Sequence, residues 1–94
     1  MNRKNQIHLI CDFLKTWRKT RRLSQEQVKQ STGIDVSNYE THRCEPGLRK
    51  LLILCDYYGI SFSWLVQIVA EVASGAISED EFVKKAERPS NSVE

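Results

Sequence analysis

The hydrophobic residues of this chain recur at intervals of three and four along most of its length. That spacing places them on one side of a helix and is typical of amphipathic helices packed around a shared core. Glycine, proline and short polar residues separate the hydrophobic segments from one another. The pattern predicts an all-α protein with helices over residues 3–20, 24–32, 35–42, 47–58, 61–74 and 78–87.

The start of the second helix and the turn that follows it are marked most clearly. Ser24 and Gln27 have the spacing of a capping box, in which each side chain binds the backbone N–H of the other. Gly33 ends the helix because glycine adopts the left-handed conformation without steric cost, and Asp35 then caps the third helix. Two helices separated by so few residues must cross at a steep angle. The segment therefore predicts a helix-turn-helix, whose second helix can enter a DNA major groove.

The apolar stripes identify the residues expected in the core. On the first helix these are Ile7, Ile10, Phe13, Leu14 and Trp17, and on the fourth they are Leu48, Leu51, Leu52, Cys55 and Tyr58. Residues 66–73 are apolar on more than one face, which predicts burial on all sides. Cys11 and Cys55 are interpreted as small core residues and Cys44 as an exposed thiol, since the three cysteines have no metal-binding spacing.

Residues 14–65 resemble the XRE family of helix-turn-helix proteins, the lambda-repressor-like and Cro-like regulators. The resemblance rests on residues in a common register: Leu14, Trp17, Arg18, Leu23, Ser24, Gln25, Gly33, Val36, Ser37, Asn38, Tyr39, Glu40, Pro46, Leu51, Leu52, Cys55, Tyr58, Gly59, Ile60, Ser61 and Leu65. It implies a lambda-repressor-like five-helix domain over residues 1–75, with the helix-turn-helix at about 24–43, to which residues 76–87 add a short sixth helix. The chain departs from the family where only six residues separate Gly33 from Glu40. The first turn of the recognition helix is thereby lost.

The resemblance also implies roles for individual side chains. Arg18 aligns with a family arginine that pairs with the recognition-helix glutamate, here Glu40, and Gln25 aligns with a glutamine that contacts a DNA phosphate. On the third helix, Asn suits adenine, Arg suits guanine, and Ser and Thr suit bases or phosphates, although any exposed helix carries such residues. The residues expected to face DNA are Arg22, Gln25, Ser37, Asn38, Thr41, His42, Arg43, Arg49 and Lys50.

Charge is distributed unevenly along the chain. The net charge is only +2, but residues 1–50 hold 11 Lys and Arg against 5 Asp and Glu, whereas residues 51–94 hold 3 against 7. A basic half joined to an acidic half suggests one surface that faces a polyanion, and a solvated mixture of charges is the alternative. No segment approaches the roughly 18 apolar residues of a membrane span, so we expect a cytoplasmic protein with no membrane partner.

Nothing in the sequence predicts an enzyme. There is no Ser/His/Asp arrangement, metal-ligand spacing or phosphate-binding loop. His8 and His42 fall on separate predicted helices with no acidic partner at a telling distance. We therefore expect no catalytic residue, no metal and no cofactor.

Two interpretations of the C-terminal region lead to two functions. Residues 76–87 either complete the core of a monomer or form a homodimer surface, for which the expected residues are Trp64, Ile68, Val69, Val72 and Phe82. The first function is a sequence-specific transcriptional regulator, a dimeric repressor bound to double-stranded DNA. The alternative is an antitoxin or phage-type accessory protein whose residues 64–87 bind a toxin or another regulator. Residues 88–94 have nothing to bury and are predicted to be a disordered tail.

Overall fold

A computed structural model describes residues 5–87, with side chains up to Lys84, and this part of the chain is all-α. Its helices are α1 (Gln6–Thr20), α2 (Gln25–Thr32), α3 (Ser37–Glu40), α4 (Leu48–Tyr58), α5 (Phe62–Ser74) and α6 (Glu79–Glu87). The helical order predicted from the sequence is confirmed. The predicted tail at 88–94 and the predicted helix start at residue 3 lie outside the described residues.

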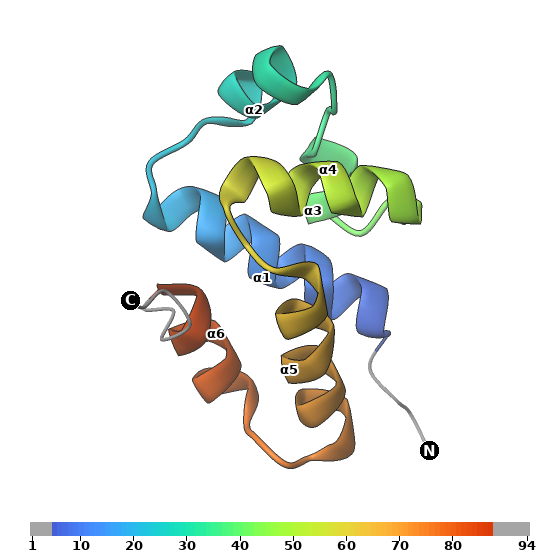
Figure 1. Cartoon of the computed structure of the whole chain (residues 1–94), viewed down its shortest axis with the longest axis vertical. Helices are drawn as coiled ribbons and strands as arrows, with labels where there is room; N and C mark the ends of the chain where they lie inside the picture. Colours follow the sequence, from blue (N-terminus) through green and yellow to red (C-terminus); the bar gives the residue numbers. More distant parts are fainter. Residues whose placement is uncertain (1–4, 88–94) are drawn as a thin grey trace.

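Helix α1 lies in the middle of the molecule. Figure 1 shows α2, α3 and α4 on one side of it and α5 and α6 on the other. Helix α1 contacts α3, α5 and α6, while α4 contacts both α2 and α5. The central helix therefore joins the helix-turn-helix segment to the C-terminal pair.

The core is made by the inner sides of these helices. The indole of Trp17 donates a hydrogen bond to the carbonyl oxygen of Tyr58 at 3.1 Å, which ties α1 to the end of α4. From α6, Phe82 is only 3 % exposed and its ring centroid lies 5.1 Å from that of Phe13. Helix α6 thus completes the core of a single chain, which is one of the two arrangements considered for residues 76–87. The buried hydrophobic residues are Leu9, Ile10, Cys11, Phe13, Leu14, Trp17, Val28, Ile34, Val36, Leu51, Leu54, Cys55, Tyr58, Ile60, Leu65, Ile68, Val69 and Phe82.

The predicted core face of α4 was partly wrong. Leu48 and Leu52 were expected inside, but they are 61 % and 45 % exposed. The buried face instead consists of Leu51, Leu54, Cys55 and Tyr58. Leu54 takes the place of Leu52 because the buried face of α4 is rotated by part of a turn relative to the predicted face. Leu48 is the first residue of the helix and lies beyond the core.

Helix α5 is not buried on all sides either. Val66 and Ala70 are exposed, which contradicts the expectation for residues 66–73, because neighbouring helices cover only one side of α5. Among residues 5–87, no single helix is both long and apolar enough to cross a membrane. Helices α4 and α5 meet that criterion only when they are taken together, and they are bent by 109° relative to one another.

Candidate nucleic-acid interface

A buried ion pair joins α1 to α3. The guanidinium of Arg18 donates two hydrogen bonds to the carboxylate of Glu40, from Nε to Oε2 at 2.7 Å and from Nη2 to Oε1 at 2.8 Å. The two side chains are only 8 % and 5 % exposed. Hydrogen bonding to Glu40 raises the pKa of Arg18 above its ordinary value. The two residues paired by the sequence are thus in contact, with the bidentate geometry that makes such pairs strong.

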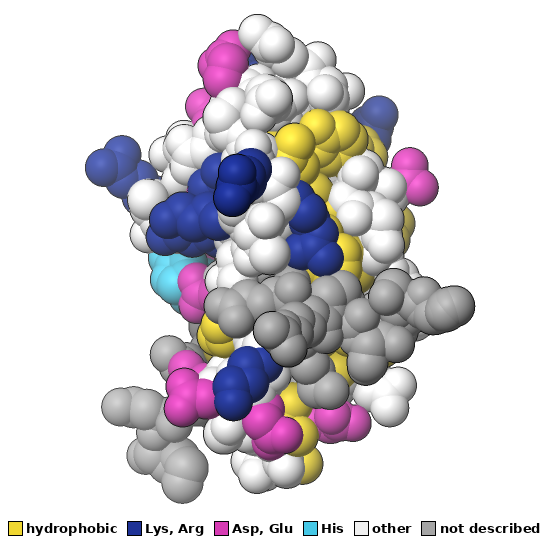
Figure 2. Space-filling model, turned by 90° about the vertical axis from the view of Figure 1, so that its left-hand side faces the viewer, with side chains coloured by type: hydrophobic (Ala, Val, Ile, Leu, Met, Phe, Trp, Pro, Cys, Tyr) yellow, Lys and Arg dark blue, Asp and Glu magenta, His cyan; other side chains and the backbone are white. Residues whose placement is uncertain are grey.

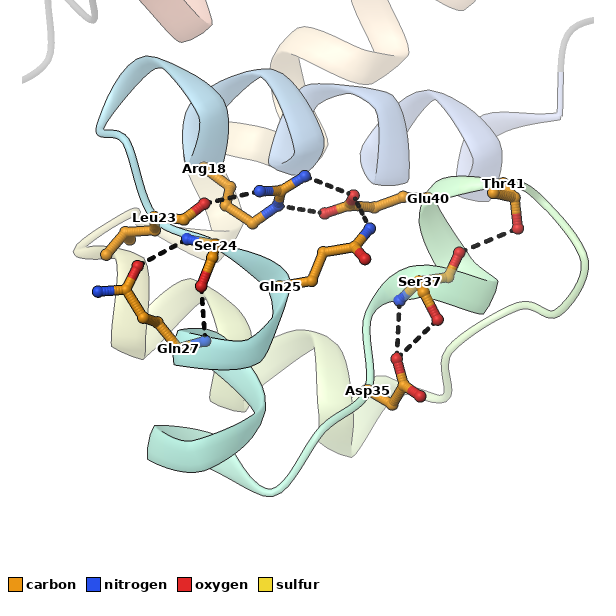
Figure 3. Close-up of polar contacts among 9 residues, drawn as sticks. All are labelled: Arg18, Leu23, Ser24, Gln25, Gln27, Asp35, Ser37, Glu40 and Thr41. Atoms are coloured by element: carbon orange, nitrogen blue, oxygen red, sulfur yellow. Dashed lines mark hydrogen bonds and ion pairs between the residues drawn. The ribbon is translucent and has the colours of Figure 1, made fainter.

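The same carboxylate also holds the start of α2. The amide of Gln25 donates one hydrogen bond to Glu40 Oε1 at 2.9 Å, and Arg18 Nη1 donates to the Leu23 carbonyl at 2.6 Å (Figure 3). Helices α1, α2 and α3 therefore share one polar network. Ser24 begins α2 with the predicted capping box, since its Oγ accepts the Gln27 N–H at 3.0 Å.

Helix α3 is a single turn rather than the predicted 35–42. The carboxylate of Asp35 accepts the N–H and the Oγ–H of Ser37, at 3.1 and 2.7 Å, so it caps the turn from just outside the helix. Those hydrogen bonds lower the pKa of Asp35. At the other end, His42 has a left-handed backbone with φ 65°, and Arg43 N–H donates to the Asn38 carbonyl at 2.9 Å. This is a Schellman ending, with histidine in the position that glycine usually occupies.

After α3 the chain runs back along α1. His42 Nε2 lies 2.7 Å from Asp12 Oδ1, and the rings of His42 and His8 stack with their centroids 4.2 Å apart. Further along, Asn5 Nδ2 donates to Glu45 Oε2 at 2.8 Å. The expectation that the two histidines lack acidic partners was wrong. The antiparallel course of this segment brings together side chains that are thirty or more positions apart in sequence.

The residues expected to face DNA fall into two groups. The first group already makes hydrogen bonds: Gln25 to Glu40, Ser37 to Asp35, Thr41 to the Ser37 carbonyl, His42 to Asp12, and Lys50 to the Tyr39 hydroxyl at 3.1 Å. The second group is exposed, and no hydrogen bond or ion pair with another described residue involves its side chains; it consists of Arg22, Asn38, Arg43 and Arg49. The second group is the part of the surface whose donors are available to a ligand.

Positive charge collects on one part of the surface. Figure 2 shows Lys and Arg side chains gathered across the upper middle of one face; acidic side chains are most numerous near its lower end, where one basic side chain lies among them, and others lie at the top and the right edge. Helix α6 occupies the lower part of that side of the molecule and begins with Glu79, Asp80 and Glu81. On α1, the spacing of Lys15 and Lys19 places both side chains on one face of the helix. The uneven charge of the sequence therefore corresponds to a polarised surface.

Most of the residues expected at a dimer surface are buried in the core. Ile68, Val69 and Phe82 are buried within one chain, so a second copy cannot reach them in this conformation. Trp64 and Val72 are half-buried at the edge of the core. Of the predicted set, only these two present area to a partner.

Sequence reasoning overlooked the histidine contacts. Asn5, Asp12 and Glu45 were not singled out, because no local motif connects the start of α1 with the segment after α3. Across residues 5–87, no three His, Cys, Asp or Glu side chains are placed to hold a metal ion.

No protein family, curated protein or solved structure matches this chain.

Proposed function

We propose that this protein is a sequence-specific DNA-binding regulator of the helix-turn-helix type. The observation that supports this best is the network of Arg18, Gln25 and Glu40, which fixes α3 against α1 and α2. A base-reading element has to be held rigidly, because hydrogen bonds to base edges depend on position and angle. The resemblance of residues 14–65 to XRE-family regulators agrees with this role.

The exposed donors divide into two tasks. Asn38 and Arg43 lie in α3 and directly after it, and they are the residue types that bind adenine and guanine edges. Arg22, two residues beyond the end of α1, and Arg49, in the first turn of α4, are the other two exposed donors and supply phosphate contacts. Because α3 is one turn long, only one or two base pairs per chain are read directly. We therefore propose a dimer, with Trp64 and Val72 as the remaining predicted contact residues, since two half-sites extend the sequence that is read.

The test is selection of bound duplexes from a random pool at about 0.1 M salt, where the phosphate contribution does not mask specificity. We expect an enriched sequence. For the enriched duplex, Asn38→Ala and Arg43→Ala should each cost about 1–3 kcal/mol of binding free energy and relax the preference at one base step. Lys84→Ala on α6 is the matched control for charge and should leave the preference unchanged. An equal loss for Lys84→Ala and Arg43→Ala, with no change in preference, would show that α3 does not read bases.

A second candidate is a protein-binding module, such as an antitoxin or phage-type accessory factor. It is favoured by the exposed apolar side chains of Leu48, Leu52 and Ile53 on α4 and Val66 on α5. Recovery of the unselected pool, together with a defined complex between this chain and a second small protein expressed from the same host, would favour the module over the regulator.

A further inference from the structure

Two histidines and two carboxylates form a cluster between α1 and the segment after α3. The cluster consists of His8, Asp12, His42 and Glu45. The His42 ring bonds Asp12 at 2.7 Å, the His8 ring lies 3.8 Å from Glu45 Oε2, and the two rings are parallel to within 1°. Each histidine therefore has its own carboxylate. Asp12 lies on α1 and Glu45 lies in the segment after α3.

The charge of this histidine cluster depends on protons. Histidine is the side chain whose charge ordinarily changes between about pH 5 and pH 8. With both rings neutral, the four side chains of the cluster carry two negative charges, on Asp12 and Glu45. Two bound protons cancel them, and each imidazolium then lies beside a carboxylate instead of facing only the other positive ring. The carboxylates thus make protonation of a stacked pair feasible.

The surroundings contribute charges that stay constant in this range. Lys15 follows Asp12 by one turn on α1, and Arg43 follows His42 directly. From α6, Glu79 lines the same shallow pocket as Asp12. The neighbouring thiol of Cys11 remains protonated, because burial raises its pKa to about 11. Among the residue types of the cluster and its surroundings, histidine is the one whose charge ordinarily changes in this range.

The position of the cluster links it to α3. His42 occupies the left-handed position that ends α3, and Arg43, one of the exposed donors, is the next residue. Protonation converts the His42–Asp12 hydrogen bond into an ion pair that holds this turn against α1. It also removes negative charge beside a surface proposed to face phosphates.

We propose that the histidine cluster is a proton-sensitive control of DNA binding, which tightens binding as the pH falls. This inference rests on the proposed function and names the regulation of the same surface. The sign follows from linkage: if DNA favours the protonated cluster, lower pH favours the bound state, and DNA in turn favours proton uptake. Both the charge change and the firmer turn act in this direction.

The chain provides a clean test, because His8 and His42 are its only two histidines. Affinity for a fixed 20-base-pair duplex is measured by fluorescence anisotropy at several values from about pH 8 to about pH 5.5, the range in which histidine titrates. The wild type should tighten by about three- to tenfold, since each charge that neutralises a phosphate changes affinity a few-fold. His42→Asn with His8→Gln should bind with nearly constant affinity across the range. Asparagine tolerates the left-handed backbone at position 42, and glutamine suits a helix at position 8.

Two further variants and one direct readout separate the outcomes. Asp12→Asn keeps a hydrogen-bond partner for His42 but removes the charge, so its pH response should be weaker than that of the wild type. Lys84→Ala, which removes a charge from α6 and none from the cluster, should retain the full response. Proton NMR should show that His8→Gln shifts the ring signals of His42, because the two rings are stacked.

Each outcome has a distinct meaning. A pH response that is the same in the wild type and in the variant without histidines would overturn the inference while leaving DNA binding intact. Absence of DNA binding at every pH would overturn the proposed function, and with it the regulatory role. Unchanged ring signals of His42 in the His8→Gln variant would show that the stack does not form in solution.

Discussion

Replacing Glu40 with glutamine tests whether the ion pair with Arg18 holds α3 in place. The substitution preserves size but removes the negative charge, and it replaces one acceptor oxygen with an NH₂ group. That group would face N–H donors of Arg18 or Gln25, which now approach the carboxylate at 2.7–2.9 Å. The guanidinium would remain buried, with the Leu23 carbonyl and the one amide oxygen at position 40 as neutral acceptors in place of the carboxylate.

The expected cost is large for a domain of this size. Removing one partner of a buried ion pair lowers the free energy of unfolding by about 3–5 kcal/mol. Both side chains here are more than nine-tenths buried. A protein of 94 residues has a total stability of roughly 5–14 kcal/mol. Glu40→Gln should therefore lose about 3 kcal/mol or more and remain folded only marginally. Glu26→Gln, the same change on the exposed face of α2, should stay within about 0.5 kcal/mol of the wild type.

Urea unfolding followed by circular dichroism measures these differences from the shift in midpoint at constant slope. A third variant, Arg18→Met with Glu40→Leu, removes both charges together. It should recover most of the loss, because replacing a buried pair with apolar residues of similar size is often neutral. If Glu40→Gln cost less than about 1 kcal/mol, the pair would behave as an exposed one and would not fix α3.

Three further predictions concern the core, a turn and the thiols. In urea unfolding, Phe82→Ala should cost about 3–5 kcal/mol and Val83→Ala less than about 1 kcal/mol, because Phe82 is buried and Val83 is exposed. Equal losses would mean that α6 does not complete the core. Gly33→Ala should cost about 1 kcal/mol, because its φ is +78° and alanine is strained in that conformation. A thermal midpoint equal to that of the wild type would refute the strain. Of the three thiols, Cys44 alone should react rapidly with a disulfide reagent at neutral pH. Cys11 and Cys55 are buried, and burial raises the pKa of each to about 11. Rapid reaction of all three thiols would show that the core is open.

Features set by neighbouring residues were predictable from the sequence. The Ser24 capping box and the left-handed Gly33 depend on residues within one turn of each other, so their spacing alone identified them. Most of the apolar stripe of α1 was recovered because that helix is covered from several sides, but the predicted Ile7 is only half-buried and the buried Leu9 was not predicted. On α4 the same reasoning wrongly placed Leu48 and Leu52 in the core. The spacing of apolar residues gives the width of the apolar stripe, but it does not show which part of that stripe packs against the other helices.

Features set by distant residues were less predictable. Arg18 and Glu40 were paired through a family resemblance, and the side chains do meet. The Asp12–His42 contact had no such guide, because it depends on the course of the chain after α3. The end of α3 was also misplaced, because His42 occupies a left-handed position that sequence reasoning expects to be glycine.

These long-range contacts explain how a helix of one turn keeps a fixed orientation. An isolated turn has too few internal hydrogen bonds to be stable, since nucleating a helix is unfavourable. Here α1 holds the segment at two places, through Arg18 at Glu40 and through Asp12 at His42. Asn38 lies before the first contact and Arg43 directly after the second. The orientation of both exposed donors is thus determined by α1. Under the proposed function, substitutions on α1 should therefore alter DNA recognition as strongly as substitutions within α3.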